Sequence, residues 1–133
     1  MSFAAREDEP SADASLDPLR DSVRTSSLAI ALVDLRTRRF IELSPRAAAL
    51  LQWQPVELAG ADVLSISEQP DATRRALELI ADGVLDSYQA KRTLRSGDGA
   101  AVDYGISVRV VARSGDRGEA LIIVTPVGEL SVT

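Results

Sequence analysis

The sequence predicts an α+β domain with five antiparallel strands in one sheet and short helices on one face of it. Two observations indicate this class. Two strand-like runs come first, helical segments follow, and three strand-like runs come last. This order is typical of helices segregated to one face of an antiparallel sheet. In addition, apolar and polar residues alternate over 102–110, as in a strand with one buried face and one wet face.

The composition removes many kinds of chemistry. The chain has 133 residues, enough for one domain with its own core, and it contains neither cysteine nor histidine. Disulfides, a Ser-His-Asp triad, thiolate zinc sites and histidine-ligated metal or haem are therefore excluded. No apolar run approaches the roughly 20 residues of a membrane span, and no secretion leader is evident. We expect a soluble, cytoplasmic protein without a membrane contact.

The charge is unevenly distributed. The net charge is −5, and the first 17 residues hold five acidic side chains and only one basic side chain, Arg6. Residues 1–16 are polar, small and acidic, which predicts a disordered tail; an acidic arm that binds a partner is the alternative. Nothing resembles the basic patch of a nucleic-acid-binding protein, so we expect no direct contact with nucleic acid.

A short helix is predicted over residues 17–26. Asp17 can cap this helix, Pro18 suits its first position, and Leu16, Leu19 and Val23 form an apolar stripe. A helix of this length is marginal alone, so the stripe must pack against something.

A hairpin and a broken helix are expected next. Residues 28–35 and 40–44 read as two strands joined by a turn. Ser44 stands where an N-cap belongs and Pro45 suits the first helical position. The helix stops near Trp53, and a single helical turn begins after Pro55.

The second half of the chain predicts one longer helix followed by three strands. Residues 68–83 predict a helix with one apolar side that ends near Gly83. Three strands then follow over 87–96, 100–112 and 118–127, joined by glycine-rich turns that suit tight hairpins.

The order of these elements, and the residues from 44 to 60, resemble the PAS sensory domain family. The family pattern here is Asn-Pro, two alanines, Leu-Leu-Gly-Tyr and Pro-Glu-Glu-Leu-x-Gly. The matching positions are Pro45, Ala47, Ala48, Leu50, Leu51, Pro55, Glu57, Leu58 and Gly60. Asp34 also stands where PAS domains often end their first strand, and residues 97–99 and 122–127 resemble the hairpin turn and the closing strand. The resemblance places a PAS domain at 27–127 and a tail or start of a linker at 128–133.

Three departures from the family pattern stand out. Ser44 replaces the usual asparagine, which a hydroxyl can match as a helix cap. Gln52 and Trp53 replace Gly-Tyr, so the glycine that eases a left-handed helix end is lost. The Asp-Ile-Thr output motif of many PAS domains is absent near Thr125.

The resemblance implies a central cavity walled by the broken helices, and a sensory or dimerisation role. PAS domains variously bind flavin, haem, a chromophore or a small metabolite, or bind nothing and dimerise. Without cysteine, the flavin photoadduct is excluded, and without histidine the usual haem ligand is missing. A non-covalent small organic ligand, or a packed core without a ligand, remains. The family also leads us to expect a homodimer through Leu16, Leu19 and Val23, and a bacterial signalling or transcription regulator whose output domain lies outside this chain.

The ligand-pocket candidates are the positions expected to point inward, although simple core packing is the more common explanation of any single one. They are Ile30, Leu32, Leu50, Trp53, Leu64, Ile66, Leu77, Ile80, Tyr88, Arg92, Tyr104, Ile106 and Ile122.

Arg92 is the unusual member, because strand alternation puts it on the face of Tyr88 and Leu94. A guanidinium on an apolar face needs a partner. One interpretation is a bidentate contact with a ligand carboxylate. The others are an ion pair with Asp34 or Glu42, or a bulge that turns Arg92 to solvent.

Two other classes of function remain open at this point. A cone-shaped α+β enzyme, such as a small isomerase, would need a carboxylate or phenol in its cavity, and Asp34 with Tyr104 is the pair to consider. A profilin-like adaptor without a cavity is the other. Acidic residues are otherwise scattered and do not suggest acid–base catalysis, so we expect no enzyme activity.

Overall fold

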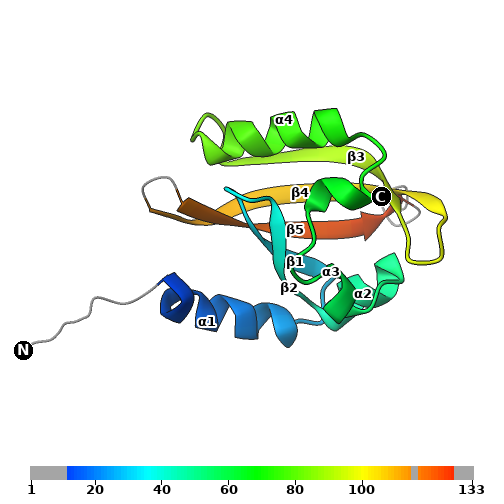
Figure 1. Ribbon diagram of the computed structural model, residues 1–133, viewed down its shortest axis with the longest axis horizontal. Helices are drawn as coiled ribbons and strands as arrows, with labels where there is room; N and C mark the ends of the chain where they lie inside the picture. Colours follow the sequence, from blue (N-terminus) through cyan, green and yellow to red (C-terminus); the bar gives the residue numbers. More distant parts are fainter. Residues whose placement is uncertain (1–11, 115–116, 128–133) are drawn as a thin grey trace, which may run out of the picture.

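A single antiparallel sheet organises the molecule, with strand order β2-β1-β5-β4-β3 (Figure 1). The computed structural model describes residues 12–114 and 117–127. Residues 1–11 of the predicted tail at 1–16, and the predicted tail at 128–133, lie outside these residues. The strands are β1 Ile30–Asp34, β2 Arg39–Leu43, β3 Ser87–Arg95, β4 Ala101–Ser114 and β5 Arg117–Pro126. The helices are α1 Ala12–Arg24, α2 Pro45–Leu51, α3 Pro55–Leu58, α4 Pro70–Ala81 and the 3₁₀ helix η1 Val63–Ile66.

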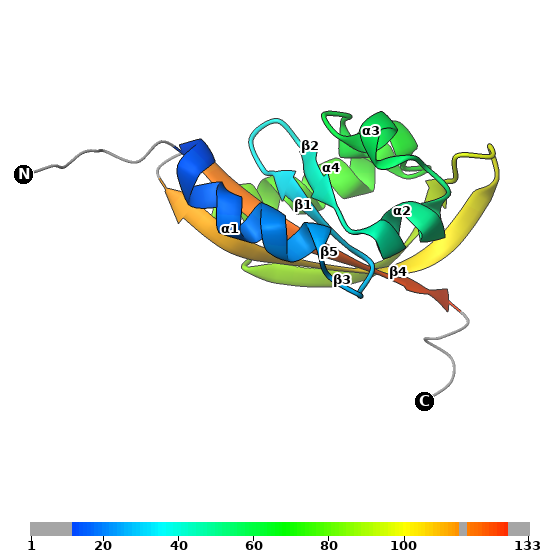
Figure 2. The same ribbon diagram turned by 90° about the horizontal axis from the view of Figure 1, so that it is seen from below.

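The predicted fold class is confirmed. The sheet has five strands and is antiparallel throughout, and α2, α3 and α4 lie together on one side of it (Figure 2). The last strand, β5, lies between β1 and β4, so the first and last strands of the sequence pair in the middle of the sheet. The first and last strands are therefore fixed in the centre of the sheet by hydrogen bonds to each other.

Ser44 joins the first hairpin to α2. Its hydroxyl accepts a hydrogen bond from the backbone N–H of Ala47 at 3.1 Å, the N-cap contact that the sequence predicts. The same oxygen accepts from the N–H of Ile30 at 3.1 Å and donates to the carbonyl of Leu28 at 2.6 Å. Ser44 is fully buried, so this one hydroxyl satisfies backbone groups of both the strand and the helix.

Helix α2 ends at Gln52, which adopts the left-handed conformation with φ 59°. The sequence has no glycine here. A residue with a side chain therefore takes the left-handed conformation at the end of the helix, which is less favourable than for glycine. The last four carbonyls of α2 are nevertheless bonded. Those of Ala48 and Ala49 accept from the chain just beyond the helix. Those of Leu50 and Leu51 accept from the Tyr104 hydroxyl at 3.2 Å and from Gly97 N–H at 3.0 Å.

Helix α1 covers the opposite face of the sheet and differs from its predicted bounds. The helix spans Ala12–Arg24, with Pro18 inside it, where a start at 17 and an end at 26 were predicted. The predicted tail therefore also ends earlier than residue 16. A proline suits a first helical turn but does not require one, since inside a helix it removes a single hydrogen bond at a cost that other contacts can offset.

Both faces of β1 are buried, and this corrects the predictions that Ile30 and Leu32 line the pocket. Ile30 and Leu32 point to α1 and pack with Val23, whereas Ala31 and Val33 point into the main core. A strand that is apolar on both faces has no alternation in its sequence, so its inward face could not be assigned. Leu32, predicted to line the pocket, therefore lies on the wrong side of the sheet for that role.

The helices of the described residues offer no membrane span, because none is both long and apolar enough to cross a bilayer.

Gly97 provides a test of the contact between the β3–β4 hairpin and α2. A Cβ at residue 97 would lie 1.7 Å from the carbonyl oxygen of Gln52, a backbone atom that cannot rotate away. We expect Gly97→Ala to lower the free energy of unfolding by about 3 kcal/mol or more. Urea unfolding measures this change.

Gly60→Ala is the matched control. Gly60 has φ 83° and open space around the added Cβ, so only backbone strain of about 1 kcal/mol is expected. Equal losses in the two variants would contradict a close contact at residue 97.

Candidate functional site

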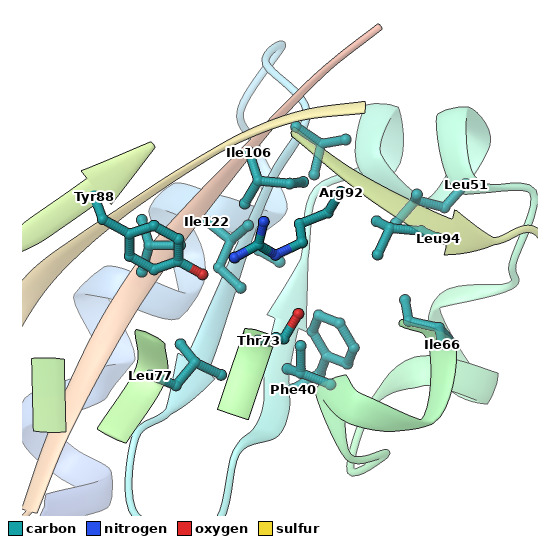
Figure 3. Close-up of a pocket in the computed structure, with 14 residues that line it drawn as sticks. Phe40, Leu51, Ile66, Thr73, Leu77, Tyr88, Arg92, Leu94, Ile106 and Ile122 are labelled. Carbon is teal, nitrogen blue, oxygen red and sulfur yellow. The ribbon is translucent and has the colours of Figure 1, made fainter. Parts of the chain in front are cut away.

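A small cavity lies between the inner face of the sheet and the helices α2, η1 and α4 (Figure 3). Its volume is about 40 Å³. All five strands contribute side chains to the lining. The lining residues are Ala31, Phe40, Leu51, Val63, Ile66, Thr73, Leu77, Tyr88, Arg92, Leu94, Ile106, Val108, Ile122 and Val124.

Arg92 brings a positive charge to this otherwise apolar wall. Strand β3 pairs with β4 without a register shift, and Arg92 lies opposite Tyr104. Its side chain therefore points inward with Tyr88 and Leu94. One guanidinium nitrogen, Nη1, donates to the backbone carbonyl of Lys91 at 3.0 Å, and Nε is buried without a hydrogen-bond partner.

The two simpler interpretations of Arg92 are wrong. There is no bulge in β3 to turn the residue to solvent. The side chain of Glu42 lies on the opposite face of the sheet, beside α1, where its carboxylate is 3.7 Å from the guanidinium of Arg20 and 3.3 Å from that of Arg24. Asp34 accepts hydrogen bonds from the two N–H groups of its own turn, at 2.8 and 3.1 Å. Among the described residues, no carboxylate forms an ion pair with Arg92.

Two hydroxyl groups face the same space as Arg92. Figure 3 shows the oxygens of Tyr88 and Thr73 directed toward the cavity near the guanidinium. Thr73 Oγ1 is 3.1 Å from the hydroxyl of Ser67. Burial raises the pKa of the Tyr88 phenol, and the positive charge of Arg92 partly opposes this rise. Tyr88 is thus a neutral hydrogen-bond donor at physiological pH.

The structure brings only part of the predicted set together. The predicted residues that do line the cavity are Ile66, Leu77, Tyr88, Arg92, Ile106 and Ile122. The lining residues that sequence reasoning missed are Ala31, Phe40, Leu51, Val63, Thr73, Leu94, Val108 and Val124. Leu94 and Val108 could have been found by extending the alternation of Arg92 and Ile106 by one step. Thr73 gave no signal, because a threonine on the apolar side of a helix reads as ordinary packing.

The remaining candidates lie elsewhere. Ile80 is in the main core, and Leu64 is only partly buried in η1, outside the lining. Leu50 and Trp53 pack against the edge of the core. None of these four residues lines the cavity, because most buried side chains simply contact one another.

Tyr104 and Trp53 hold the walls of the cavity without lining it. The Tyr104 hydroxyl donates to the carbonyl of Leu50 at 3.2 Å, so a backbone carbonyl supplies the partner that a buried phenol needs. The indole N–H of Trp53 donates to the carbonyl of Arg95 at 2.9 Å. Both contacts attach the end of α2 to the β3–β4 hairpin.

The three residues proposed for a dimer contact lie on α1. Val23 is buried against Ile30 and Leu32 of its own sheet, and Leu19 is half-buried beside this cluster. The side chain of Leu16 lies outside what the structure describes. A dimer would therefore use the exposed parts of α1 and its surroundings, since Val23 is already covered.

Solved structures show what this arrangement is. The PAS domain of an HTR-like protein from Haloarcula marismortui superposes with a TM-score of 0.63 at 14% identity, over 84% of this chain and 91% of that one. A domain of a sensory box sensor histidine kinase/response regulator from Geobacter sulfurreducens gives 0.65 at 15% identity, over 85% and 95%.

The chain has the PAS fold. The LOV protein of Rhodobacter sphaeroides is also similar, with a TM-score of 0.72 at 14% identity, over 88% of this chain and 70% of that one. No protein-family model and no curated protein matches the sequence. The predicted resemblance to PAS domains is thus confirmed at the level of the fold.

The PAS cavity of this chain does not suit the large cofactors of the fold. A volume of about 40 Å³ is far below the roughly 300–1,000 Å³ of pockets for drug-sized ligands, so neither a flavin nor a haem fits. The sequence also lacks the cysteine and histidine that would attach them. Within the described part of the chain, no group of three or more acidic residues could hold a metal ion.

The isomerase-like pair is not assembled. Asp34 lies opposite Glu119 of β5, whereas Tyr104 lies opposite Pro126 at the other end of that strand. Seven residues of strand separate these positions by on the order of 20 Å. The carboxylate and the phenol therefore cannot act on one substrate.

The Tyr88 phenol reports on the position of Arg92. Because the guanidinium favours the phenolate, Arg92→Met should raise the pKa of Tyr88 further. The stabilising contribution of the neutral phenol is complete below about pH 10 and is lost as the pH rises through the raised pKa. NMR of ¹³C-labelled tyrosine measures the titration.

Lys91→Met is the control, since Lys91 is exposed and alternates to the other face of β3. An unchanged Tyr88 titration in Arg92→Met would mean that the guanidinium does not face the phenol.

Proposed function

We propose that this chain is a sensory module that takes up a small organic molecule in its central cavity. In this proposal it is the input domain of a bacterial signalling or transcription regulator and acts as a homodimer. The observation that carries the proposal is an almost wholly apolar cavity in a PAS fold, whose lining residues include Thr73, Tyr88 and Arg92 with their polar ends near one another (Figure 3). Ligand sites typically combine these two properties.

The position of the cavity suits a sensor. Its lining includes Leu77 of α4, Leu51 of α2 and Ile122 of β5, so one small molecule would touch both layers of the domain. A ligand that binds one arrangement of these layers more tightly would shift the population toward it. Sensor histidine kinases among the structural neighbours give this role its precedent.

Methyl NMR with a library of small neutral and charged fragments tests ligand uptake. We expect at least one fragment to shift the methyl signals of Leu77, Ile106 and Ile122, which line the cavity. The methyl groups of Ile30 and Leu32, on the other face of the sheet, should not move. A packed core without ligand would leave all five unchanged.

Ala31→Leu is the matched variant for this experiment. Ala31 is buried in the cavity wall, so the added carbons should fill the space and abolish the shifts. Ala49→Leu adds the same atoms on the exposed face of α2 and should leave binding intact.

The homodimer would form around α1 on the outer face of the sheet. Leu28 is 61% exposed and Ile123 is 40% exposed, and Ile123 pairs with Ile30 beneath α1. We expect Ile123→Glu to weaken the dimer at least about tenfold, because it puts a charge in an apolar contact. Sedimentation velocity across a concentration series measures this. A wild-type chain that stays monomeric would refute this part of the proposal.

A further inference from the structure

We propose that the molecule taken up is a small monocarboxylate with a short apolar tail, whose carboxylate binds the guanidinium of Arg92. The inference rests on the proposed function, since it names the chemical class of ligand for the same cavity. It follows from an unpaired cation, two neighbouring hydroxyl groups, and the size of the space.

The first step is that Arg92 has no ion-pair partner within residues 12–114 and 117–127. A guanidinium remains protonated at any physiological pH and has five N–H donors. In this structure Nη1 bonds the carbonyl of Lys91, and Nε is buried with no partner. Arg92 is half-buried, so part of its guanidinium remains hydrated, but the buried Nε is a donor that a hydrogen-bond acceptor inside the cavity would satisfy. An anion in the cavity would supply both that acceptor and the opposite charge.

The second step is that no carboxylate of the described residues provides this anion. Glu68, close in sequence to the cavity residue Ile66, forms an ion pair with Arg95 at 3.0 Å. Glu42 and Asp34 are engaged in the contacts described above. Among the lining residues, Arg92 is the single charged side chain.

The third step concerns the number of negative charges. One guanidinium can balance one carboxylate, and its flat N–H edge matches the two oxygens of that group. A dicarboxylate or a dianionic phosphate would bury a second charge with no cation to meet it. Tyr88 and Thr73 add neutral hydroxyl groups beside the guanidinium (Figure 3). This set therefore favours a monoanion.

The fourth step concerns the rest of the ligand. Beyond the polar end, the lining consists of aliphatic and aromatic side chains, among them Phe40, Leu77 and Ile106. A volume of about 40 Å³ equals the space of roughly three water molecules at 10–15 Å³ each. Acids of about two or three carbons come nearest to this size, whereas longer chains would require the wall to move.

Propionate and propionamide form the decisive pair of probes, since they share shape and differ in charge. In the methyl NMR titration, we expect propionate to bind the wild-type chain at least tenfold more tightly than propionamide. Arg92→Met should remove this preference and leave propionamide unaffected. Lys91→Met, which deletes a charge from the other face of the same strand, should keep it.

Two further measurements guard against a variant that fails for other reasons. Arg92→Met replaces a half-buried guanidinium, whose Nε has no hydrogen-bond partner, by an apolar side chain of similar length, so its thermal midpoint without ligand should be no lower than that of the wild type. If it nevertheless fails to fold, Tyr88→Phe keeps the charge and should weaken propionate several-fold more than propionamide.

The outcomes separate the two proposals. If propionamide binds as tightly as propionate, the cavity takes ligands but the carboxylate assignment is wrong. If nitrate binds as tightly as propionate, the site recognises a planar anion and the apolar tail plays no part, which also overturns the assignment. If no fragment of any charge shifts the cavity methyl groups, the proposed sensory function itself is wrong.

Discussion

The end of helix α2 at Gln52 is the constraint on which the cavity depends. A continuous helix would keep the carbonyls of Leu50 and Leu51 in its own hydrogen bonds. Because the helix stops, these two groups accept from Tyr104 and from Gly97 instead. The indole of Trp53 adds a third bond, to Arg95. The β3–β4 hairpin is thereby attached to the end of α2, next to the lining residue Leu51.

The contact tolerates little variation in its backbone. Gly97 approaches the carbonyl of Gln52 so closely that a side chain has no room, and Gln52 itself carries the left-handed turn that a glycine would adopt more easily. The strained residue and the small one are thus neighbours in space. Their close approach leaves this contact little freedom. Across the cavity, α4 is held by packing and by side-chain hydrogen bonds, such as the one between Thr73 and Ser67.

Much of the fold and some of the site could be predicted from the sequence. Ser44 and Pro45 begin α2 as expected, and Asp34 ends β1. The alternation of β3 correctly put Tyr88 and Arg92 on one face, and both line the cavity. The assignments failed where alternation was absent. Leu32 lies in a strand that is apolar throughout, so its direction depended on α1 covering the second face. Trp53 and Tyr104 were expected to point inward, but the partners of their polar atoms are backbone carbonyls distant in sequence, which no local pattern reveals.

The sequence by itself determined the class of fold, the positions of the strands and the break in the helix, because each follows from local periodicity, caps and prolines. It also determined that no thiol or imidazole chemistry takes place here. Only the tertiary structure decided that neither of the two candidate carboxylates pairs with Arg92. The sequence offered two acidic partners for it, and folding commits one of them to α1 and the other to a turn. Whether a buried charge is balanced depends on which side chains the sheet brings within a few ångströms, and that is set by register and packing across the whole domain.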